Sequence, residues 1–371
     1  MRARVAAGVV SVLLLAAASS PGELFEKIHA VKWPKGTYGY RGAMGDFLLL
    51  KDGSILMSYT QDGVGIMAVR SADQGRTWGQ PSMLVPMPKP PAKGYFAHPS
   101  FLRVANGEVL LSYIYSTYPT TPYFGHNYCR RSADEGKTWT DPFIMTPYPG
   151  YVLVHNDRLS TLSSGRIVAP AEYKAHLPRT NDHEGYVGMT FYSDDQGHSW
   201  QASKNTVDLY GDGKHIEVQE ADVVELKDGR LMMFARTYSG FPVRAYSSDK
   251  GESWSKGEPV RELKMPCAGL PTVRRIPSTG DLLFLWIGER SVDKHDSRIQ
   301  RRCALSAAIS RDEGKTFEHF RYIARDPEDD FGYQCVEFVG KDLALVGFHA
   351  RDGLHVARIG IDWFYGVTGT F

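Results

Sequence analysis

SADEGKTW, residues 132–139, is one of five copies of a short string that recurs along the chain. The other copies are SADQGRTW from Ser71, SDDQGHSW from Ser193, SSDKGESW from Ser247 and SRDEGKTF from Ser310. Each reads S-x-D-x-G-x-[TS]-[WF], and successive copies begin 54 to 63 residues apart. Recurrence at such a period indicates a chain built from repeated structural units.

The residues of the string predict a tight hairpin turn. The aspartate, Asp134 in this copy, can accept hydrogen bonds from nearby backbone N–H groups, and Gly136 can supply the positive φ that closes a turn. The final ring, Trp139, is placed to pack against the neighbouring repeat, while Ser and Thr hydroxyls bond the remaining backbone groups. The string is therefore expected to be structural.

A second repeat alternates with the first. It consists of two apolar runs separated by a short segment that contains a glycine. FLLLKDGSILMSY and VVELKDGRLMMFAR are two of the six copies, and such a pattern predicts a hairpin. The turn glycines are Gly53, Gly107, Gly165, Gly229, Gly280 and Gly340. Six hairpins with five strings predict an all-β fold, a six-bladed β-propeller of four-stranded antiparallel blades. The last blade has no string, and we expect the two chain ends, near residues 28 and 355, to close it.

The repeats and the net charge limit the number of domains and the classes of binding partner. Each repeat exposes an apolar face that only its neighbours can bury, so residues 21–371 are expected to form one domain. A formal net charge of +1 gives no electrostatic footprint for nucleic acid or anionic membrane, so neither is expected as a partner.

Residues 1–20 have the layout of a secretory signal peptide. Arg2 and Arg4 precede a mostly apolar stretch, and small residues follow it at 16–20. The stretch is short for a membrane span, so a secreted or periplasmic protein is expected. Pairing in an oxidising compartment and burial as free thiols both stay open for the cysteines, with burial the simpler interpretation. These are Cys129, Cys267, Cys303 and Cys335.

Polar residues recur where the inner strands of the hairpins begin or end. His98, Asn156 and Glu220 each lie nine residues before the turn glycine of their hairpin. Tyr333 lies seven before its own, and Arg236 lies seven after the glycine of the hairpin that Glu220 enters. Equivalent positions in a propeller face one mouth of the ring, so we expect these side chains to converge.

The five strings and these segments resemble the Asp-box (BNR-repeat) sialidase superfamily over nearly the whole mature chain. QEADVVELKDGRLMMFART resembles the stretch with the family's catalytic glutamate and second substrate-binding arginine, which implies those roles for Glu220 and Arg236. RRCALSAAISRDEGKTF is similar to the stretch with the third arginine, here Arg302. FGYQCVEFVGKDLALVGF resembles the late tyrosine segment, which makes Tyr333 the implied nucleophile.

The first segment departs from the family pattern. YGYRGAMGDFLLLKDG stands where the family has an F-R-I-P motif, and Arg41 is the arginine available there. Asp62, nine residues before the first string, stands in the place of the acid/base aspartate. GFHARDG stands where the family carries the glutamate that supports the first arginine. This departure bears on substrate identity more than on fold.

Each assignment has a structural alternative. Glu220 with Arg236 can be an ion pair across one hairpin, Arg302 a solvated strand residue, and Asp62 a turn residue. Tyr333 competes with nineteen other tyrosines for a place in the core. Four further residues, in AHPSF and VHNDRLS, either contact a sugar or cap strands: His98, Asn156, Asp157 and Arg158.

The resemblance implies an exo-α-sialidase that acts on sialylated glycans with retention. Three guanidinium groups can bind the carboxylate of the sugar in bidentate fashion, as lysines cannot. A neutral tyrosine avoids repulsion by that carboxylate, and Glu220 can accept its proton. Asp62 would protonate the leaving oxygen and then deprotonate water. This chemistry requires no metal and no organic cofactor.

Two other functions remain open at this point. The enzyme alternative is a propeller hydrolase or lyase for another acidic sugar, an ulosonic or uronic acid. The alternative from another class is a non-catalytic glycan-binding propeller, since the strings alone also occur in proteins without this activity. Hydrolysis of a sialoside but of no other acidic glycoside separates the two enzymes. Saturable glycan binding without turnover marks the glycan-binding propeller.

Overall fold

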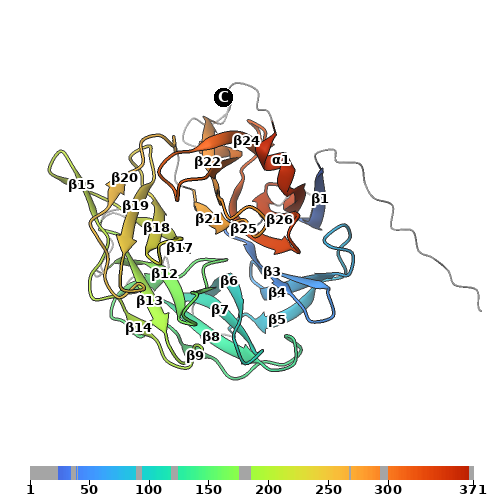
Figure 1. Ribbon diagram of the computed structural model, residues 1–371. Coiled ribbons are helices and arrows are strands. Elements are labelled where there is room, and N and C mark those ends of the chain that lie inside the picture. Colours follow the sequence, from blue (N-terminus) through green and yellow to red (C-terminus); the bar gives the residue numbers. More distant parts are fainter. Residues whose placement is uncertain are drawn as a thin grey trace, which may run out of the picture.

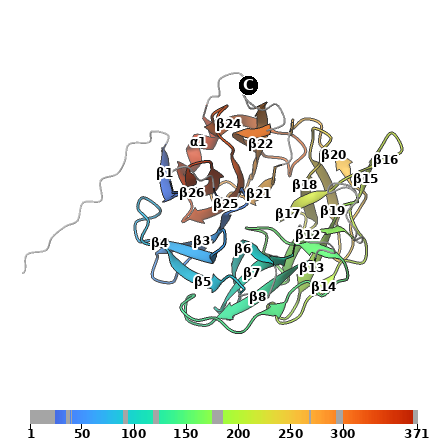
Figure 2. The same cartoon turned by 180° about the vertical axis from the view of Figure 1, so that it is seen from behind.

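A computed structural model describes residues 24–34, 39, 41–88, 94–117, 124–174, 185–266, 269–292 and 300–366. Within them the chain is all-β apart from one short helix, α1 (Ile361–Tyr365). The sheets stand around a central axis in a propeller-like ring, with β6, β17, β21 and β25 nearest its centre (Figure 1). Figure 2 shows the same ring from behind. No helix among these residues is long and apolar enough to cross a membrane.

Four of the sheets have four antiparallel strands each. One contains β2 (Met44–Leu49), β3 (Ile55–Gln61), β4 (Gly65–Ser71) and β5 (Ser82–Pro86). Another contains β17 (Gln219–Glu225), β18 (Leu231–Arg236), β19 (Val243–Ser247) and β20 (Glu258–Pro259). A third contains β21 (Thr272–Arg275), β22 (Leu282–Val292), β23 (Gln300–Ser310) and β24 (Glu318–Arg325). The fourth contains β25 (Gly332–Val339), β26 (Leu343–Ala350), β27 (Gly353–Gly360) and β1 (Phe25–Lys32).

A nine-stranded sheet occupies the region expected to form the second and third blades. Its strands are β6 (Tyr95–Arg103), β7 (Val109–Ser116), β8 (Gly125–Ser132), β9 (Phe143–Ile144), β10 (Tyr151–Leu153), β11 (Ser160–Thr161), β12 (Ile167–Lys174), β13 (Val187–Ser193) and β14 (Gln201–Ala202). A separate two-stranded hairpin follows, β15 (Leu209–Gly211) with β16 (Lys214–Ile216).

This sheet corrects the expectation of six separate four-stranded blades. Strand β10 pairs antiparallel with β12 and also parallel with β8, through the single pair Tyr151 and Gly125. The ring of Tyr151 occupies the space that a Cβ on Gly125 would need. Because Gly125 has no side chain, the two strands approach closely enough to join.

The chain ends close the last sheet, as expected. Strand β1 pairs antiparallel with β27, from Phe25 opposite Ile359 to Lys32 opposite Gly353. Both views place β1 beside the sheet of β26 (Figures 1 and 2).

The Asp-box strings form the turns that their residues predict. In the first copy, Asp73 Oδ1 accepts the Thr77 N–H at 2.9 Å, and Asp73 Oδ2 accepts the Thr77 hydroxyl at 2.7 Å. These bonds lower the pKa of Asp73 to about 2. Gly75 has φ of 84°, and Gln74 before it is also left-handed, at 59°. The left-handed non-glycine residue recurs in every copy and was not foreseen: Gln74, Glu135, Gln196, Lys250 and Glu313.

The ring that ends each string packs between neighbouring sheets. Trp78 lies against a cluster that contains Phe47 of β2 and Leu345 of β26. Trp139 likewise packs on Leu48 and Leu56 of the preceding sheet. The apolar core is thus divided among clusters between adjacent sheets, which confirms the expected contact of each string with the neighbouring repeat.

Three cysteines, Cys129, Cys303 and Cys335, are buried free thiols. Burial raises the pKa of Cys129 to about 12. Cys267 and the expected leader, residues 1–20, lie outside the described residues.

Candidate active site

Three inner strands bend at corresponding places near one mouth of the ring. The pairing register shifts between Ala97 and Ser100 in β6, between Gln219 and Asp222 in β17, and between Gly332 and Cys335 in β25. The residues within these bulges have left-handed φ: His98 at 52°, Glu220 at 48° and Tyr333 at 50°. A bulge re-aims the side chain that it carries, and a left-handed non-glycine residue costs about 1–3 kcal/mol. The rest of each sheet holds these three residues in this conformation.

Tyr333 and Glu220 form a hydrogen-bonded pair inside the mouth. The Tyr333 hydroxyl donates to Glu220 Oε1 at 2.7 Å. The other carboxylate oxygen, Oε2, lies 3.0 Å from Nη1 of Arg236. The side chains of Glu220 and Arg236 are only 3% and 8% exposed, so this pair is shielded from solvent. The structure brings together the three residues with the strongest sequence assignments.

The surroundings move the pKa values of the pair in opposite directions. Burial raises the pKa of Glu220, but the charges of Arg236, His155 and Arg302 and the hydrogen bond from Tyr333 outweigh burial and lower it to about 2. Burial and the negative charge of Glu220 raise the pKa of Tyr333. At neutral pH the site therefore holds a carboxylate beside a neutral phenol.

Two arginines flank the pair with unused donors. The guanidinium carbon of Arg302 lies 5.4 Å from the centre of the Tyr333 ring. Arg302 Nη1 and Arg236 Nε are buried and have no hydrogen-bond partner within the described part of the chain. Gly332 leaves room for this approach, because a Cβ there would lie 3.1 Å from Arg302 Nη1. Buried cationic N–H groups without partners form a site for an anion.

Arg41 joins this group through an aspartate that the sequence did not reveal. Its Nε and Nη2 lie 2.6 and 2.5 Å from Asp330 Oδ2. The other oxygen of Asp330 accepts the backbone N–H of Arg302 at 2.9 Å. Asp330 thus links the Arg41 side chain to the backbone of Arg302. The acidic run before Tyr333, EDD at 328–330, was the available signal.

A cleft of about 230 Å³ opens over Glu220, Arg236 and Tyr333. His98 lies on its wall, with its ring centre 4.8 Å from that of Tyr333. Burial, and after it the neighbouring His155, lowers the pKa of His98 well below 6.5, so this ring is neutral. The cleft is also lined by three tyrosines: Tyr95, Tyr151 and Tyr186.

Glu172 is a second carboxylate in the cleft that sequence reasoning missed. Its Oε2 accepts the backbone N–H of Glu220 at 3.2 Å, and its Oε1 lies 3.5 Å from His155 Nε2. Both side chains are nearly fully buried, at 6% and 5% exposed. A charged residue within the apolar strand β12 was the signal that could have identified it. Its contact with the bulge helps to fix the position of Glu220.

Asp62 lies in the exposed turn between β3 and β4, just past the end of β3. The end of β3 lies beside the start of β2, because the Thr60 N–H donates to the Ala43 carbonyl at 2.7 Å. Asp62 does not line the 230 Å³ cleft. Its side chain is exposed to solvent.

Residues 156–158 are engaged with the backbone. Asn156 Nδ2 donates to the carbonyls of Gly45, at 3.0 Å, and Tyr333, at 3.1 Å, and so supports the segment that carries Tyr333. Asp157 Oδ2 accepts the Val336 N–H at 3.0 Å. The side chain of Arg158 is fully buried and pairs with Asp222 at 3.5 Å. The structure does not bring Asp157 and Arg158 to the cleft, so sugar contact by these two is not supported.

Comparison with known proteins shows the family of the chain. The BNR repeat-like domain family matches residues 60–337, most of the chain. The chain belongs to the BNR-repeat sialidase superfamily. It is similar to a sialidase of Micromonospora viridifaciens, with 29% identity over 259 residues, which are 61% of this chain and 38% of that protein. A sialidase of Bacteroides fragilis is 22% identical over 220 residues, 57% of this chain and 37% of that protein. The chain thus spans well under half the length of these relatives.

Solved structures share the fold with this member of the superfamily. A Hadza microbial sialidase superimposes with a TM-score of 0.66 and 18% identity, over 88% of this chain and 68% of that one. A leech intramolecular trans-sialidase gives a TM-score of 0.63 and 14% identity, over 91% and 71%. A protein of unknown function from Dyadobacter fermentans gives 0.66 and 18%, over 91% and 99%.

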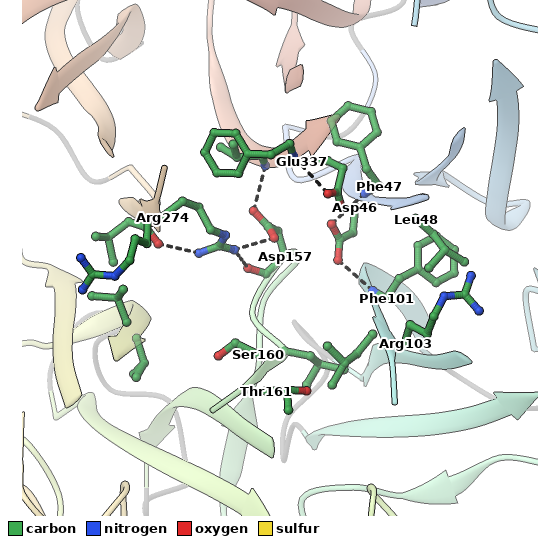
Figure 3. Close-up of a pocket in the computed structure, with 18 of the residues that line it drawn as sticks. Asp46, Phe47, Leu48, Phe101, Arg103, Asp157, Ser160, Thr161, Arg274 and Glu337 are labelled. Atoms are coloured by element: carbon green, nitrogen blue, oxygen red, sulfur yellow. Dashed lines mark hydrogen bonds and ion pairs between the residues drawn. The ribbon is translucent and has the colours of Figure 1, made fainter. Parts of the chain in front are cut away.

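The other end of the axis holds a larger cavity of about 640 Å³ (Figure 3). The inner strands run from the sialidase-like cleft to this cavity: β17 lines the cleft with Glu220 and the cavity with Val224. Likewise β25 lines the cleft with Tyr333 and the cavity with Glu337. Figure 3 shows the carboxylates of Asp46 and Asp157 and the guanidinium of Arg274 at this end.

The carboxylates at this end bond to backbone N–H groups of other inner strands. Asp46 Oδ2 accepts the Phe101 N–H of β6 at 2.8 Å. Asp222 Oδ2 accepts the Val273 N–H of β21 at 2.9 Å and lies 2.5 Å from Arg274 Nη1. These bonds join neighbouring sheets around the axis, which makes the cluster structural.

Proposed function

We propose that this protein is a sialidase-like glycoside hydrolase that removes terminal sialic acid from glycoconjugates with retention of configuration. The observation that carries the proposal is the 2.7 Å hydrogen bond from Tyr333 to Glu220, flanked by Arg236 and Arg302 with unused donors. A phenol paired with a carboxylate beside an anion site suits a sugar that carries a carboxylate at its anomeric carbon.

The substrate carboxylate would bind to Arg236 and Arg302, with Arg41 as the third arginine. Arrival of this anion would offset the positive charges that keep the pKa of Glu220 near 2. The pKa of Glu220 then rises, and the carboxylate becomes a better proton acceptor for Tyr333. Substrate binding itself would prepare the nucleophile.

The reaction follows in two displacements. Tyr333 Oη attacks the anomeric carbon, its proton passes to Glu220, and the bond to the leaving oxygen breaks as Asp62 protonates that oxygen. Water then attacks the same carbon, losing a proton to Asp62, while Glu220 returns the proton to Tyr333. Two inversions give retention. His98 lies against the Tyr333 ring as a neutral neighbour, placed to contact the sugar.

One further part of the proposal rests on sequence and another on the pairing of strands. Residues 1–20 suggest action outside the cytoplasm, in a secreted or periplasmic form. The nine-stranded sheet would hold two of six repeat units, because its halves are joined through only one residue pair, Tyr151 with Gly125.

The test is release of 4-methylumbelliferone from its α-sialoside by the purified protein, with Tyr333→Phe measured beside it. We expect turnover by the wild type and a loss of at least about a thousandfold in kcat for the variant. Tyr192→Phe is the matched control, because that phenol bonds Gln201 on an outer strand, away from the cleft. It should keep wild-type turnover.

Other outcomes would redirect the proposal. A folded wild type that cleaves a uronic or ulosonic acid glycoside but no sialoside would assign the arginines to a different acidic sugar. Saturable glycan binding without turnover, unaltered by Tyr333→Phe, would make the protein a glycan-binding propeller.

A further inference from the structure

Two histidines and an aspartate meet where the ring is closed, and none of them lines the cleft. His29 of β1 and His355 of β27 are direct cross-strand partners, and their rings stack with centres 4.4 Å apart. Asp352, in the turn between β26 and β27, lies against both rings. Donor atoms of the three residues all lie within 4.8 Å of one another. Among the residues the structure describes, they are the one such group of His, Cys, Asp or Glu side chains.

We propose that His29, Asp352 and His355 form a binding site for a divalent transition-metal ion of the Zn²⁺ class. Two imidazole nitrogens and one carboxylate oxygen are the donors that Zn²⁺ prefers, whereas Ca²⁺ and Mg²⁺ prefer oxygen ligands throughout. Three protein ligands leave one position of a tetrahedral ion for water. The 62% exposed side chain of Asp352 gives the ion access from solvent.

The hydrogen bonds around His29 leave a lone pair facing the carboxylate. His29 Nε2 lies 3.2 Å from the backbone carbonyl oxygen of Asp352, a contact that requires the ring proton on Nε2. Nδ1 then carries a lone pair, and it lies 3.7 Å from Asp352 Oδ2. A cation between this lone pair and the carboxylate would be bonded by both. An imidazole whose second nitrogen donates to a carbonyl is the usual arrangement of a metal-binding histidine.

His355 offers the second nitrogen. Its Nε2 lies 2.8 Å from Asp352 Oδ1, and its buried Nδ1 has no hydrogen-bond partner within the described ranges. The contact with a carboxylate oxygen places the ring proton on Nε2. An ion that binds Nε2 displaces this proton, which Nδ1 can take because no other described group bonds it.

The backbone allows the small closure that binding needs. Zn–N and Zn–O bonds of about 2.0–2.2 Å place tetrahedral ligand atoms about 3.3 Å apart, so the side chains must draw together by about an ångström. An exposed turn carries Asp352, and His29 is part-exposed, with 25% of its side chain accessible. A bound ion would tie the N-terminal strand to the last hairpin across 323 residues of chain and so stabilise the closure of the ring.

The experiment is isothermal titration of the full chain, without a polyhistidine tag and after EDTA treatment, with ZnCl₂. We expect one Zn²⁺ per chain and a higher melting temperature with Zn²⁺ present. His29→Gln and His355→Gln should each weaken binding by at least about tenfold and abolish the melting shift. His198→Gln is the control, since it removes an exposed histidine of a different repeat. Ca²⁺ should produce no shift.

Asp352→Asn keeps the test valid if a histidine variant fails to fold, because the aspartate side chain is largely exposed. This variant should fold and bind Zn²⁺ at least about tenfold more weakly. Absence of Zn²⁺ binding by the wild type would overturn the proposal. So would affinities in the three site variants equal to that of His198→Gln. Sialoside turnover plays no part in either result, so this proposal and the proposed function can fail separately.

Discussion

Glu220 and Asp222 lie two residues apart on β17, both are buried, and both bond an arginine, yet they are satisfied in different ways. Glu220 bonds the side chains of Tyr333 and Arg236. Asp222 accepts backbone N–H groups of Val223 and Val273, each at 2.9 Å, besides its bond to an arginine. A carboxylate held by backbone groups is part of the sheet, whereas one held by side chains beside unused donors can exchange partners with a ligand.

The same contrast separates the two ends of the axis. The cleft has Arg302 Nη1 and Arg236 Nε without partners in the part of the chain that is described. At the other end, Asp157 and Asp222 both bond Arg274, at 2.5 Å each. Burial of charge alone therefore does not mark the functional end of a propeller. The identity of the bonding partners does.

The largest expected effect comes from Glu220→Gln, which we predict to lower kcat for a sialoside by about a hundredfold to ten-thousandfold. Glutamine can still accept the Tyr333 hydrogen bond but cannot take its proton. Arg236 keeps its 2.6 Å bond to Gln219, so the fold should be retained. Steady-state kinetics, with circular dichroism to check folding, measure this. Full activity in the variant would remove Glu220 from the mechanism.

The second prediction is a change that affects stability and leaves activity unaltered. Asp222→Asn should lower the free energy of unfolding by about 2–3 kcal/mol, because Arg274 loses one of its two carboxylates and stays buried. Turnover by the folded fraction should stay at the wild-type level. Urea denaturation followed by tryptophan fluorescence gives the stability. Asp228→Asn, in an exposed turn of the same sheet, is the control and should change it by less than about 0.5 kcal/mol. Equal midpoints for the two variants would refute the structural role of Asp222.

The parts of the fold that the sequence predicts are those set by residues close together in the chain. A turn glycine or an Asp-box aspartate acts within a few residues, and Gly229 and Asp73 adopt the turns that their neighbours dictate. The joining of β8 to β10 could not be read in this way. It depends on how closely Gly125 and Tyr151 approach, which only the packed sheets determine.

The candidate site shows the same limit. Repeat register placed Glu220, Arg236 and Tyr333 together because equivalent strand ends share one height along the axis. Asp330 was missed, since it meets Arg41 across 289 residues of chain. For Asp157 the sequence left sugar contact and a strand-cap role open, and its carboxylate accepts the Val336 N–H at the other end. The repeat register predicts the position of a residue along the propeller axis. The bulge determines the direction of its side chain.

The third prediction compares two adjacent arginines. Arg302→Lys should reduce kcat/KM by about tenfold to a hundredfold, mainly through KM, because an ammonium group cannot make the bidentate contact. Arg301→Lys should leave kcat/KM nearly unchanged, since Arg301 pairs with the half-exposed Glu328 at 3.0 Å. Both are measured with the same fluorogenic sialoside. A larger loss for Arg301→Lys would mean that the third arginine of the site is misassigned.

The smallest expected effect is a dependence of stability on pH. It compares Glu337 of β25, at the far cavity, with Glu220 of β17, at the cleft. Burial, and after it the charge of Asp157, raises the pKa of Glu337 from 4.5 to about 7. The folded protein then holds a proton that the unfolded chain has lost, so stability falls as pH rises from about 4.5 to 7. Since Glu337 is only partly buried against the cavity, we expect a loss of about 1 kcal/mol between pH 5 and 7. Urea denaturation at several pH values measures it.

Glu337→Gln should remove this part of the pH dependence, whereas Glu220→Gln should leave it in place. The pKa of Glu220 is lowered to about 2, so its stabilising contribution is lost only as pH falls below about 4.5 and is constant in this window. Asp46, whose pKa is also raised by burial and by Asp157, would account for any slope that remains in Glu337→Gln. An unchanged slope in Glu337→Gln would show that water reaches this carboxylate freely. The far cavity would then be as open to an incoming ligand as the cleft, and the bonding pattern would no longer tell the two ends apart.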